Sequence, residues 1–359
     1  MAQYGLDNIR NLALLAHNGA GKTSLAEAIL FNTKIINRLG KVSEGSTTSD
    51  YDPAEQKRAM SISLSMLPYI WQGNKINLMD TPGYPDFIGE VKSAIRVSEG
   101  AVIVVCAASS VEVGTEQVWA YCNAVNLPRI VYVNRMDREN VDFTKVVDQI
   151  QSKFGRKCLP IQLPIGEHTT FQGVIDLLKM KSYTGAVSKE GEVPAELSNE
   201  AKSLREKLVE SIAETEDALL EKFLGGEELN PEELTKALTK AVAAGKLIPI
   251  MAGAGLQNIG VLPLMDAIVN YLPPPKDHQV EIVGEDNKPA KMAADPKGNL
   301  AALVFKTSAD PYVGRLTYFR VYCGAITSNS QVWNVTRNEH ERIGQLFILR
   351  GKNQEAVQE

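Results

Sequence analysis

The sequence has few cysteines, no long apolar run and no excess of positive charge. Its four cysteines, Cys106, Cys122, Cys158 and Cys323, are scattered without paired metal-ligand spacing, so we expect reduced core residues. The longest apolar run, residues 101–108, is far too short to span a bilayer. Because the net charge is −5, the surface is not basic overall, and any contact with nucleic acid has to be local.

What the sequence does contain is four short boxes in a fixed order. The first lies between an apolar run (residues 11–15) and a helical pattern (residues 24–30). A phosphate-binding loop needs this strand, loop and helix, because backbone N–H groups and the helix dipole converge there on one anion. Lys22 is expected to bridge the β- and γ-phosphates, and Thr23 to ligate Mg²⁺. The box comprises Ala16, His17, Asn18, Gly19, Ala20, Gly21, Lys22 and Thr23, and Ser24 follows it.

The chain enters this loop almost at once, so its N-terminus has no signal-peptide layout. The polar segment from about residue 35 to 60 predicts a mobile loop, which would let Ser61, the second box, reach Mg²⁺ and the γ-phosphate. An ordinary surface loop is the alternative.

The third box, Asp80, Thr81, Pro82 and Gly83, follows a predicted strand over residues 75–79. That strand would deliver Asp80 to the sheet edge where α/β folds bind ligands, and there the carboxylate can hold Mg²⁺ through water. The backbone N–H of Gly83 can then face the γ-phosphate, which makes the following segment sensitive to the nucleotide state.

The fourth box, Asn134, Arg135, Met136 and Asp137, follows a predicted strand over residues 129–133. The Asp137 carboxylate can accept hydrogen bonds from the N1–H and N2–H₂ edge of guanine, whereas adenine offers a lone pair at N1. A later strand from residue 248 leads into Gly253, Ala254 and Gly255, and we expect the Gly255 N–H to face guanine O6. The boxes together predict a GTP- and GDP-binding site with Mg²⁺.

Strand and helix signals alternate from residue 10 to about 150, which predicts an α/β fold with a doubly wound, mostly parallel sheet of the P-loop GTPase type. We expect its first part at residues 1–154, an inserted α+β subdomain at 155–247 with one long helix over 196–224, and its last part at 248–280. Residues 285–359 predict a partial antiparallel β-barrel, with strands at 300–307, 314–323, 331–335 and 342–349. An unclosed barrel exposes sheet edges, so we expect a chain truncated at its C-terminus.

These boxes, the long insertion and residues 309–316 resemble bacterial elongation factor G over essentially the whole chain. The resemblance implies a GTPase that acts in translocation or recycling on the ribosome, where its partners are large-subunit RNA and stalk proteins. Lys22, the Gly83 N–H and Tyr84 are the expected catalytic groups. Neither a membrane nor DNA is an expected partner, and we expect a cytoplasmic monomer.

Three departures from the family indicate a divergent paralogue. Tyr84 replaces the histidine that positions the attacking water, and Ala59, Met60 and Ser61 replace Gly-Ile-Thr. A third departure is in the phosphate loop, where Asn18 and Gly19 replace the family's aspartate and alanine. A tyrosine hydroxyl can orient water but carries no cation near neutral pH, so we expect slower, ribosome-stimulated hydrolysis. The alternatives are a ribosome-associated GTP-binding regulator with little hydrolysis and a ribosomal protection factor.

Overall fold

A seven-stranded sheet forms the centre of the protein, for which a computed structural model describes residues 4–283, 288–310 and 314–359. Its strand order is β2-β3-β1-β4-β5-β11-β6, and all neighbours are parallel except β2 and β3. The predicted α/β class is therefore confirmed. The strands are β1 (Ile9–Ala16), β2 (Ser65–Trp71), β3 (Asn74–Asp80), β4 (Gly100–Cys106), β5 (Arg129–Asn134), β6 (Cys158–Pro160) and β11 (Ile248–Ala252).

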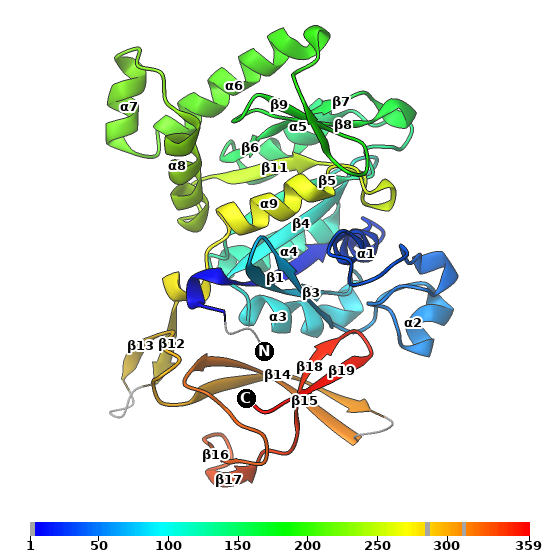
Figure 1. Cartoon of the computed structure of the whole chain (residues 1–359), viewed down its shortest axis with the longest axis vertical. Helices are drawn as coiled ribbons and strands as arrows, with labels where there is room; N and C mark the ends of the chain where they lie inside the picture. The colour runs from blue at the N-terminus through cyan, green and yellow to red at the C-terminus, as the bar shows by residue number, and fades with distance from the viewer. Residues whose placement is uncertain (1–3, 284–287, 311–313) are drawn as a thin grey trace.

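Helices cover both faces of this sheet (Figure 1). Successive β1 residues point to opposite faces: Leu12 and Leu14 pack with one core cluster, and Ala13 and Leu15 with the other. Strands buried on both faces read as continuous apolar runs, which is why β1 and β4 were predictable from sequence. The first cluster includes α1 (Lys22–Asn32) and α9 (Val261–Tyr271); the second includes α3 (Ile88–Arg96), α4 (Val113–Ala124) and α5 (Phe143–Phe154).

The insertion forms a separate layer beyond the edge strand β6, drawn in green in Figure 1. A four-stranded sheet, in the order β10-β9-β8-β7, is followed by three helices. The predicted single helix over 196–224 is wrong, because the N–H groups of Thr215 and Glu216 bond the carbonyls three residues back and end α6. The elements are β7 (Gln162–Ile165), β8 (Gly173–Asp176), β9 (Lys181–Thr184), β10 (Lys189–Gly191), α6 (Ser198–Ala213), α7 (Asp217–Leu224) and α8 (Pro231–Ala243).

The described residues of the C-terminal part form four antiparallel two-stranded ladders, as expected of β-rich sequence with frequent turn signals. The predicted strand over 342–349 is divided between β17 and β18. Pro311, Tyr312 and Val313 of the family-like segment, and residues 285–287 of the predicted barrel, lie outside the described residues. The ladders pair β12 (Gln279–Val283) with β13 (Pro289–Ala293), β14 (Ala301–Asp310) with β15 (Gly314–Cys323), β16 (Gln331–Asn334) with β17 (Glu339–Arg342), and β18 (Leu346–Arg350) with β19 (Asn353–Val357).

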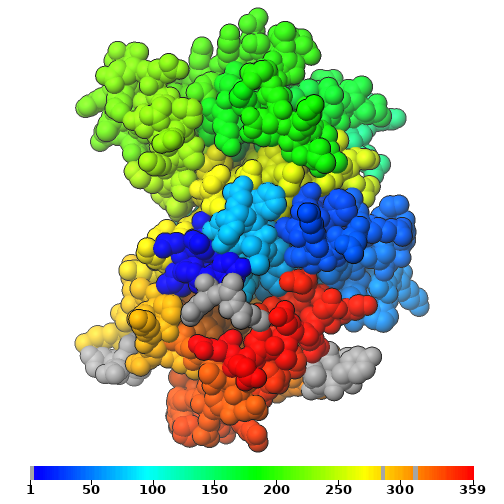
Figure 2. All heavy atoms as spheres, in the orientation of Figure 1, coloured from blue at the N-terminus to red at the C-terminus, as the bar shows by residue number. Residues whose placement is uncertain are grey.

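The last hairpin, β18–β19, lies against β2 and against Thr48 of the segment that precedes it. Figure 2 shows its red atoms in contact with the blue region, and the Gly351 N–H donates to the Met66 carbonyl at 3.0 Å. All four cysteines are buried and unpaired, which confirms that prediction. Among the described residues, no helix is both long enough and apolar enough to cross a bilayer.

Candidate functional site

The predicted boxes meet at one edge of the sheet. Leu14 pairs with Asp80 across β1 and β3, and Cys106 pairs with Asn134 across β4 and β5. Because parallel strands place their carboxyl ends at the same edge, this register brings together boxes that are far apart in sequence.

The first box forms a tight loop from β1 into α1. Gly19 and Gly21 have φ of +80° and +92°, a region that favours glycine, and Gly21 caps α1. Gly83 approaches this loop so closely that a Cβ there would lie 2.8 Å from the Asn18 Cα. Lys22 is buried, and burial lowers the pKa of its ammonium while the Asp80 and Asp50 carboxylates oppose that shift. A buried cation beside a helix N-terminus suits a polyphosphate.

The three predicted metal ligands lie together. The Thr23 hydroxyl donates to Asp80 Oδ2 at 3.0 Å, and its oxygen is 3.2 Å from the Ser61 hydroxyl. Burial raises the pKa of Asp80, and its Oδ1 is buried with no hydrogen-bond partner. An orphaned buried carboxylate oxygen beside two hydroxyls is a donor set that Mg²⁺ would satisfy.

Two further residues of this cluster were missed from sequence. The Ser49 hydroxyl donates to Asp80 Oδ2 at 2.7 Å. Asp50 is buried with both carboxylate oxygens unpartnered, and burial together with the nearby Asp80 charge raises its pKa to about 6. Neither residue follows a strand or belongs to a motif, so no sequence signal marked them. Their presence strengthens the fit of a divalent cation at this position.

Ser49 and Asp50 belong to the α1–β2 connection (residues 33–64), which is more ordered than the mobile loop predicted for residues 35–60. It contains the helix α2 (Pro53–Arg58), whose N-terminus is closed by a capping box between Asp52 and Glu55. The buried Glu55 also accepts the N–H groups of Ile62 and Ser63 at 2.9 and 3.0 Å. These bonds hold the end of the connection, and Ser61 with it, beside Thr23.

The fourth box and the loop after β11 line a cavity of about 40 Å³. Asn134 joins its walls, since its amide donates to the Ala20 carbonyl at 3.0 Å and accepts the Gly255 N–H at 2.9 Å. The Gly255 N–H, which we expected to face guanine O6, is therefore engaged inside the protein. Asp137 is half-buried in the cavity wall. The lining residues are Gly21, Ser24, Asn134, Arg135, Asp137, Arg138, Gly255 and Leu256.

Other predicted site residues lie near these boxes, and their side chains or backbone groups bond to other parts of the protein. The buried Thr81 hydroxyl donates to the Leu14 carbonyl at 2.7 Å and so ties β3 to β1. His17 lies 3.4 Å from the Glu112 carboxylate at the start of α4. Met136 is buried in the core, and Gly253 accepts its N–H at 3.2 Å. Tyr84 is half-buried and directly follows Gly83, where it precedes the turn Pro85–Phe87.

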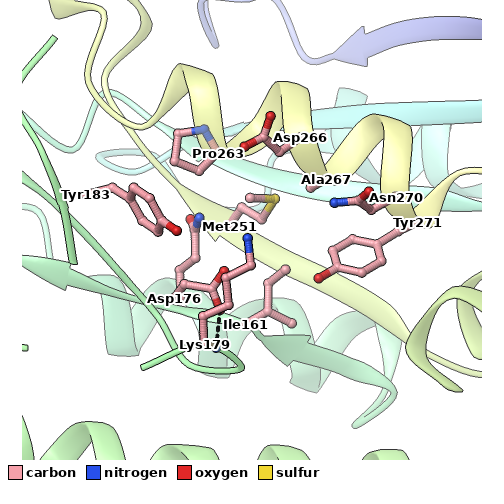
Figure 3. Close-up of a pocket in the computed structure, with 11 residues that line it drawn as sticks. Ile161, Asp176, Lys179, Tyr183, Met251, Pro263, Asp266, Ala267, Asn270 and Tyr271 are labelled. Carbon is pink, nitrogen blue, oxygen red and sulfur yellow. Dashed lines mark hydrogen bonds between the residues drawn. The ribbon is translucent and has the colours of Figure 1, made fainter. Parts of the chain in front are cut away.

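A second cavity, between the insertion and α9, lies away from these boxes (Figure 3). Its volume of about 30 Å³ holds roughly one water molecule. Asp176 and Asp266 face it, and burial raises the pKa of both. Asp176 already accepts the N–H groups of Leu178 and Lys179, each at 2.9 Å. This crevice lies at the junction between two layers.

Comparison with known proteins matches both parts of the chain. Residues 7–274 match the family described as elongation factor Tu GTP binding domain, and residues 299–359 match elongation factor G domain 2. The chain is 40% identical to elongation factor G of Thermotoga maritima and 41% identical to that of Thermotoga neapolitana, over 98% of its length and 52% of theirs. A crystal structure from Thermus thermophilus superposes with a TM-score of 0.86 at 34% identity, covering 98% of this chain and 51% of that one.

Proposed function

The chain belongs to the elongation factor G family, and from that premise we propose that it binds and hydrolyses GTP as a ribosome-stimulated translation factor. It spans about half the length of the curated relatives it matches. The observation that carries the proposal is the convergence of the phosphate loop, the Asp80 box and the Asp137 box on one sheet edge.

Each half of the nucleotide has its own set of residues in this proposal. The loop from Ala16 to Thr23 cradles the phosphates with its N–H groups, and Lys22 supplies the cation. Asp137 selects guanine, because a buried carboxylate facing the N1 lone pair of adenine would cost a few kcal/mol. Arg135 lines the same cavity as Asp137, and its guanidinium would stack on the purine face.

Mg²⁺ bound here would neutralise phosphate charge and hold the γ-phosphate in a fixed orientation. Thr23 and Ser61 would contribute hydroxyl oxygens, and Asp80 would accept from a metal-bound water. The orphaned oxygens of Asp80 and Asp50 support this assignment. Among the described residues, no group of three or more His, Cys, Asp or Glu side chains is suited to hold a metal. A Mg²⁺ that keeps several of its waters does not need such a group.

For hydrolysis, the Gly83 N–H would face the γ-phosphate and the Tyr84 hydroxyl would orient the attacking water. Tyr84 directly follows Gly83 and is half-buried, so its side chain starts beside the expected reaction centre. A neutral hydroxyl stabilises the developing charge less than a cation does, and we expect slow turnover without the ribosome. The proposed GTPase would act in translocation or in recycling, as a cytoplasmic monomer.

The experiment is GTP turnover with and without ribosomes, comparing Tyr84 with the Tyr84→His variant. Strong ribosome stimulation with Tyr84 intact supports a working translational GTPase. The substitution of the family histidine by Tyr84 favours one second candidate, a regulator that acts while GTP stays bound. Tight GTP binding with negligible turnover, restored by Tyr84→His, would establish the regulator and overturn the GTPase.

A further inference from the structure

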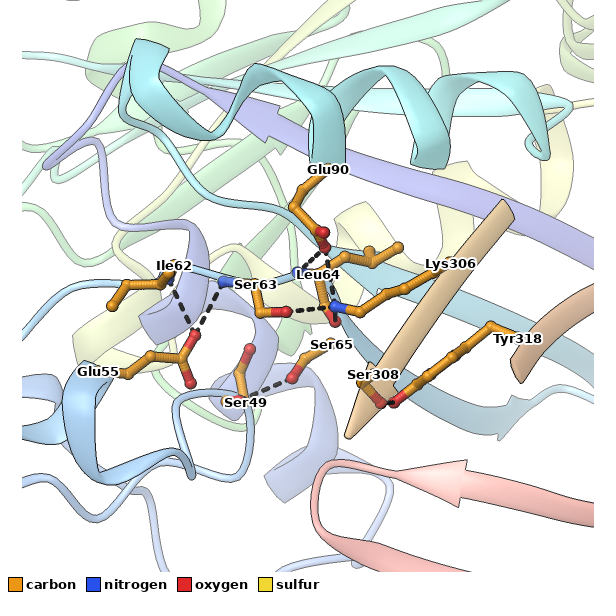
Figure 4. A network of polar contacts seen from close by, with 10 residues as sticks. All are labelled: Ser49, Glu55, Ile62, Ser63, Leu64, Ser65, Glu90, Lys306, Ser308 and Tyr318. Carbon is orange, nitrogen blue, oxygen red and sulfur yellow. Dashed lines mark hydrogen bonds and ion pairs between the residues drawn. The ribbon is translucent and has the colours of Figure 1, made fainter. Parts of the chain in front are cut away.

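Lys306 of β14 reaches out of the C-terminal ladders and ends between two segments of the nucleotide-binding domain. Its side chain is only 6% exposed. The ammonium donates to the Ser63 hydroxyl, to the Leu64 carbonyl at 2.8 Å and to Glu90 Oε2 at 2.8 Å (Figure 4). An ammonium group has three N–H donors, so these three acceptors use its full capacity. Such a complete and buried set makes Lys306 a specific contact rather than a solvated charge.

Glu90 is shared by all three elements that meet here. It lies on α3, and the same Oε2 that accepts from Lys306 also accepts the Leu64 N–H at 2.7 Å. One carboxylate and one ammonium therefore join the end of the α1–β2 connection, the helix after the Asp80 box and β14. Charge-assisted bonds of this kind are about twice as strong as neutral ones, and little water reaches the buried Lys306 ammonium, although the Glu90 side chain is 30% exposed.

Two other contacts join the C-terminal ladders to the same connection. Gly351, at the β18–β19 turn with φ of +51°, lies so close to Thr48 that a Cβ there would overlap the Thr48 carbonyl oxygen. Tyr318 of β15 lies beside Tyr51, and burial, together with the neighbouring Tyr318, raises the pKa of the Tyr51 hydroxyl. The connection is thus held on both sides of α2.

Short bonded paths lead from Lys306 to the expected metal site. Ser61, two residues before Ser63, lies 3.2 Å from the Thr23 hydroxyl. On the other path, the Ser65 hydroxyl donates to the Ser49 carbonyl at 2.7 Å, and the Ser49 hydroxyl donates to Asp80 Oδ2. A shift of the connection at the metal site would therefore strain the contacts at Lys306.

We propose that Lys306 is a positioning residue that clamps the α1–β2 connection to α3 in the arrangement that places Ser61 at Thr23. The inference rests on the proposed function, because Ser61 is there a ligand of the Mg²⁺ that accompanies the γ-phosphate. The clamp favours nucleotides with a γ-phosphate over GDP, and it makes the C-terminal ladders part of that discrimination.

The test compares Lys306→Met with Arg320→Met in the 359-residue chain. Arg320 of β15 makes a buried ion pair with Glu99 and donates to the Val97 carbonyl at 2.8 Å, so it joins the same two parts of the molecule beyond the end of α3. Affinities for GDP and for a non-hydrolysable GTP analogue are measured with Mg²⁺. Lys306→Met should weaken analogue binding about tenfold and GDP binding less than about twofold. Arg320→Met should leave the ratio of the two affinities unchanged.

Hydrogen exchange at the Leu64 amide gives a second readout that needs no nucleotide. It should become faster in Lys306→Met and in the milder variant Glu90→Gln, and stay unchanged in Arg320→Met. An unchanged affinity ratio with unchanged exchange in both clamp variants overturns the inference, as does an equal change in the Arg320→Met control. Failure of the unsubstituted chain to bind either nucleotide overturns the proposed function instead, and the exchange experiment still decides whether the clamp exists.

Discussion

The two ends of the candidate site differ in how completely their polar groups are satisfied. At the base end, the Asn134 side chain uses both its amide and its carbonyl oxygen to tie the phosphate loop to the loop after β11. At the metal end, Asp80 and Asp50 keep buried carboxylate oxygens without partners, and both have raised pKa values. A protein leaves such charges buried only where something else compensates them. The polar groups of Asn134 at the base end are therefore satisfied within the protein, whereas the metal end has buried acceptors that the proposed Mg²⁺ would satisfy.

The largest effect should come from breaking the metal end with Asp80→Asn. The amide cannot compensate a cation, so the gain in GDP affinity on adding Mg²⁺ should fall about 100-fold. The measurement is GDP affinity with Mg²⁺ and with EDTA. Asp176→Asn is the matched control, because Asp176 is also a buried aspartate with a raised pKa but lies at the other cavity. If the GDP affinity depended on Mg²⁺ equally in both variants, Asp80 would not be part of the metal site.

The base end is tested with Asp137→Asn. Exchange of a carboxylate for an amide places an N–H donor opposite the N2 amino group of guanine, whereas xanthine has a carbonyl oxygen there. GTP binding should therefore weaken about 30-fold, and xanthosine triphosphate should be favoured. Competition between the two nucleotides measures the preference. Glu139→Gln, at an exposed carboxylate two residues further on, should leave that preference unchanged. A wild-type preference for GTP in Asp137→Asn would refute the assignment.

A smaller effect is expected on stability, through Asp50. Its pKa rises on folding from 3.8 to about 6, so the folded state binds the proton more tightly, and stability falls as the pH rises through that interval. Without nucleotide, Asp50→Asn should raise the free energy of unfolding by roughly 1 to 2 kcal/mol at pH 7.5 and change it little at pH 4. Urea unfolding at the two pH values measures this. A variant that is equally stabilised at both would show that charge burial is not the cause.

The sequence predicted the boxes at strand ends better than the α1–β2 connection, for a physical reason. The Asp80 and Asp137 boxes each follow a buried apolar strand, and parallel strands bring their ends together by local rules. Asp50 and Ser49 reach the site through a polar connection whose path depends on contacts with other elements, such as Leu64 with Glu90 of α3. The prediction that the Gly255 N–H faces guanine missed its bond to Asn134, because Asn134 lies more than a hundred residues away in sequence. Likewise, nothing near Lys306 in sequence indicates Glu90.

The most direct test of the account is a titration of the unsubstituted chain with GDP, a GTP analogue and ATP, each with and without Mg²⁺. The unpartnered carboxylate oxygens at the metal end predict that both guanine nucleotides bind more tightly with Mg²⁺. The Asp137 box predicts that ATP binds far more weakly than either guanine nucleotide. Guanine nucleotide affinity that does not change when Mg²⁺ is removed, or ATP binding of equal strength, would contradict it.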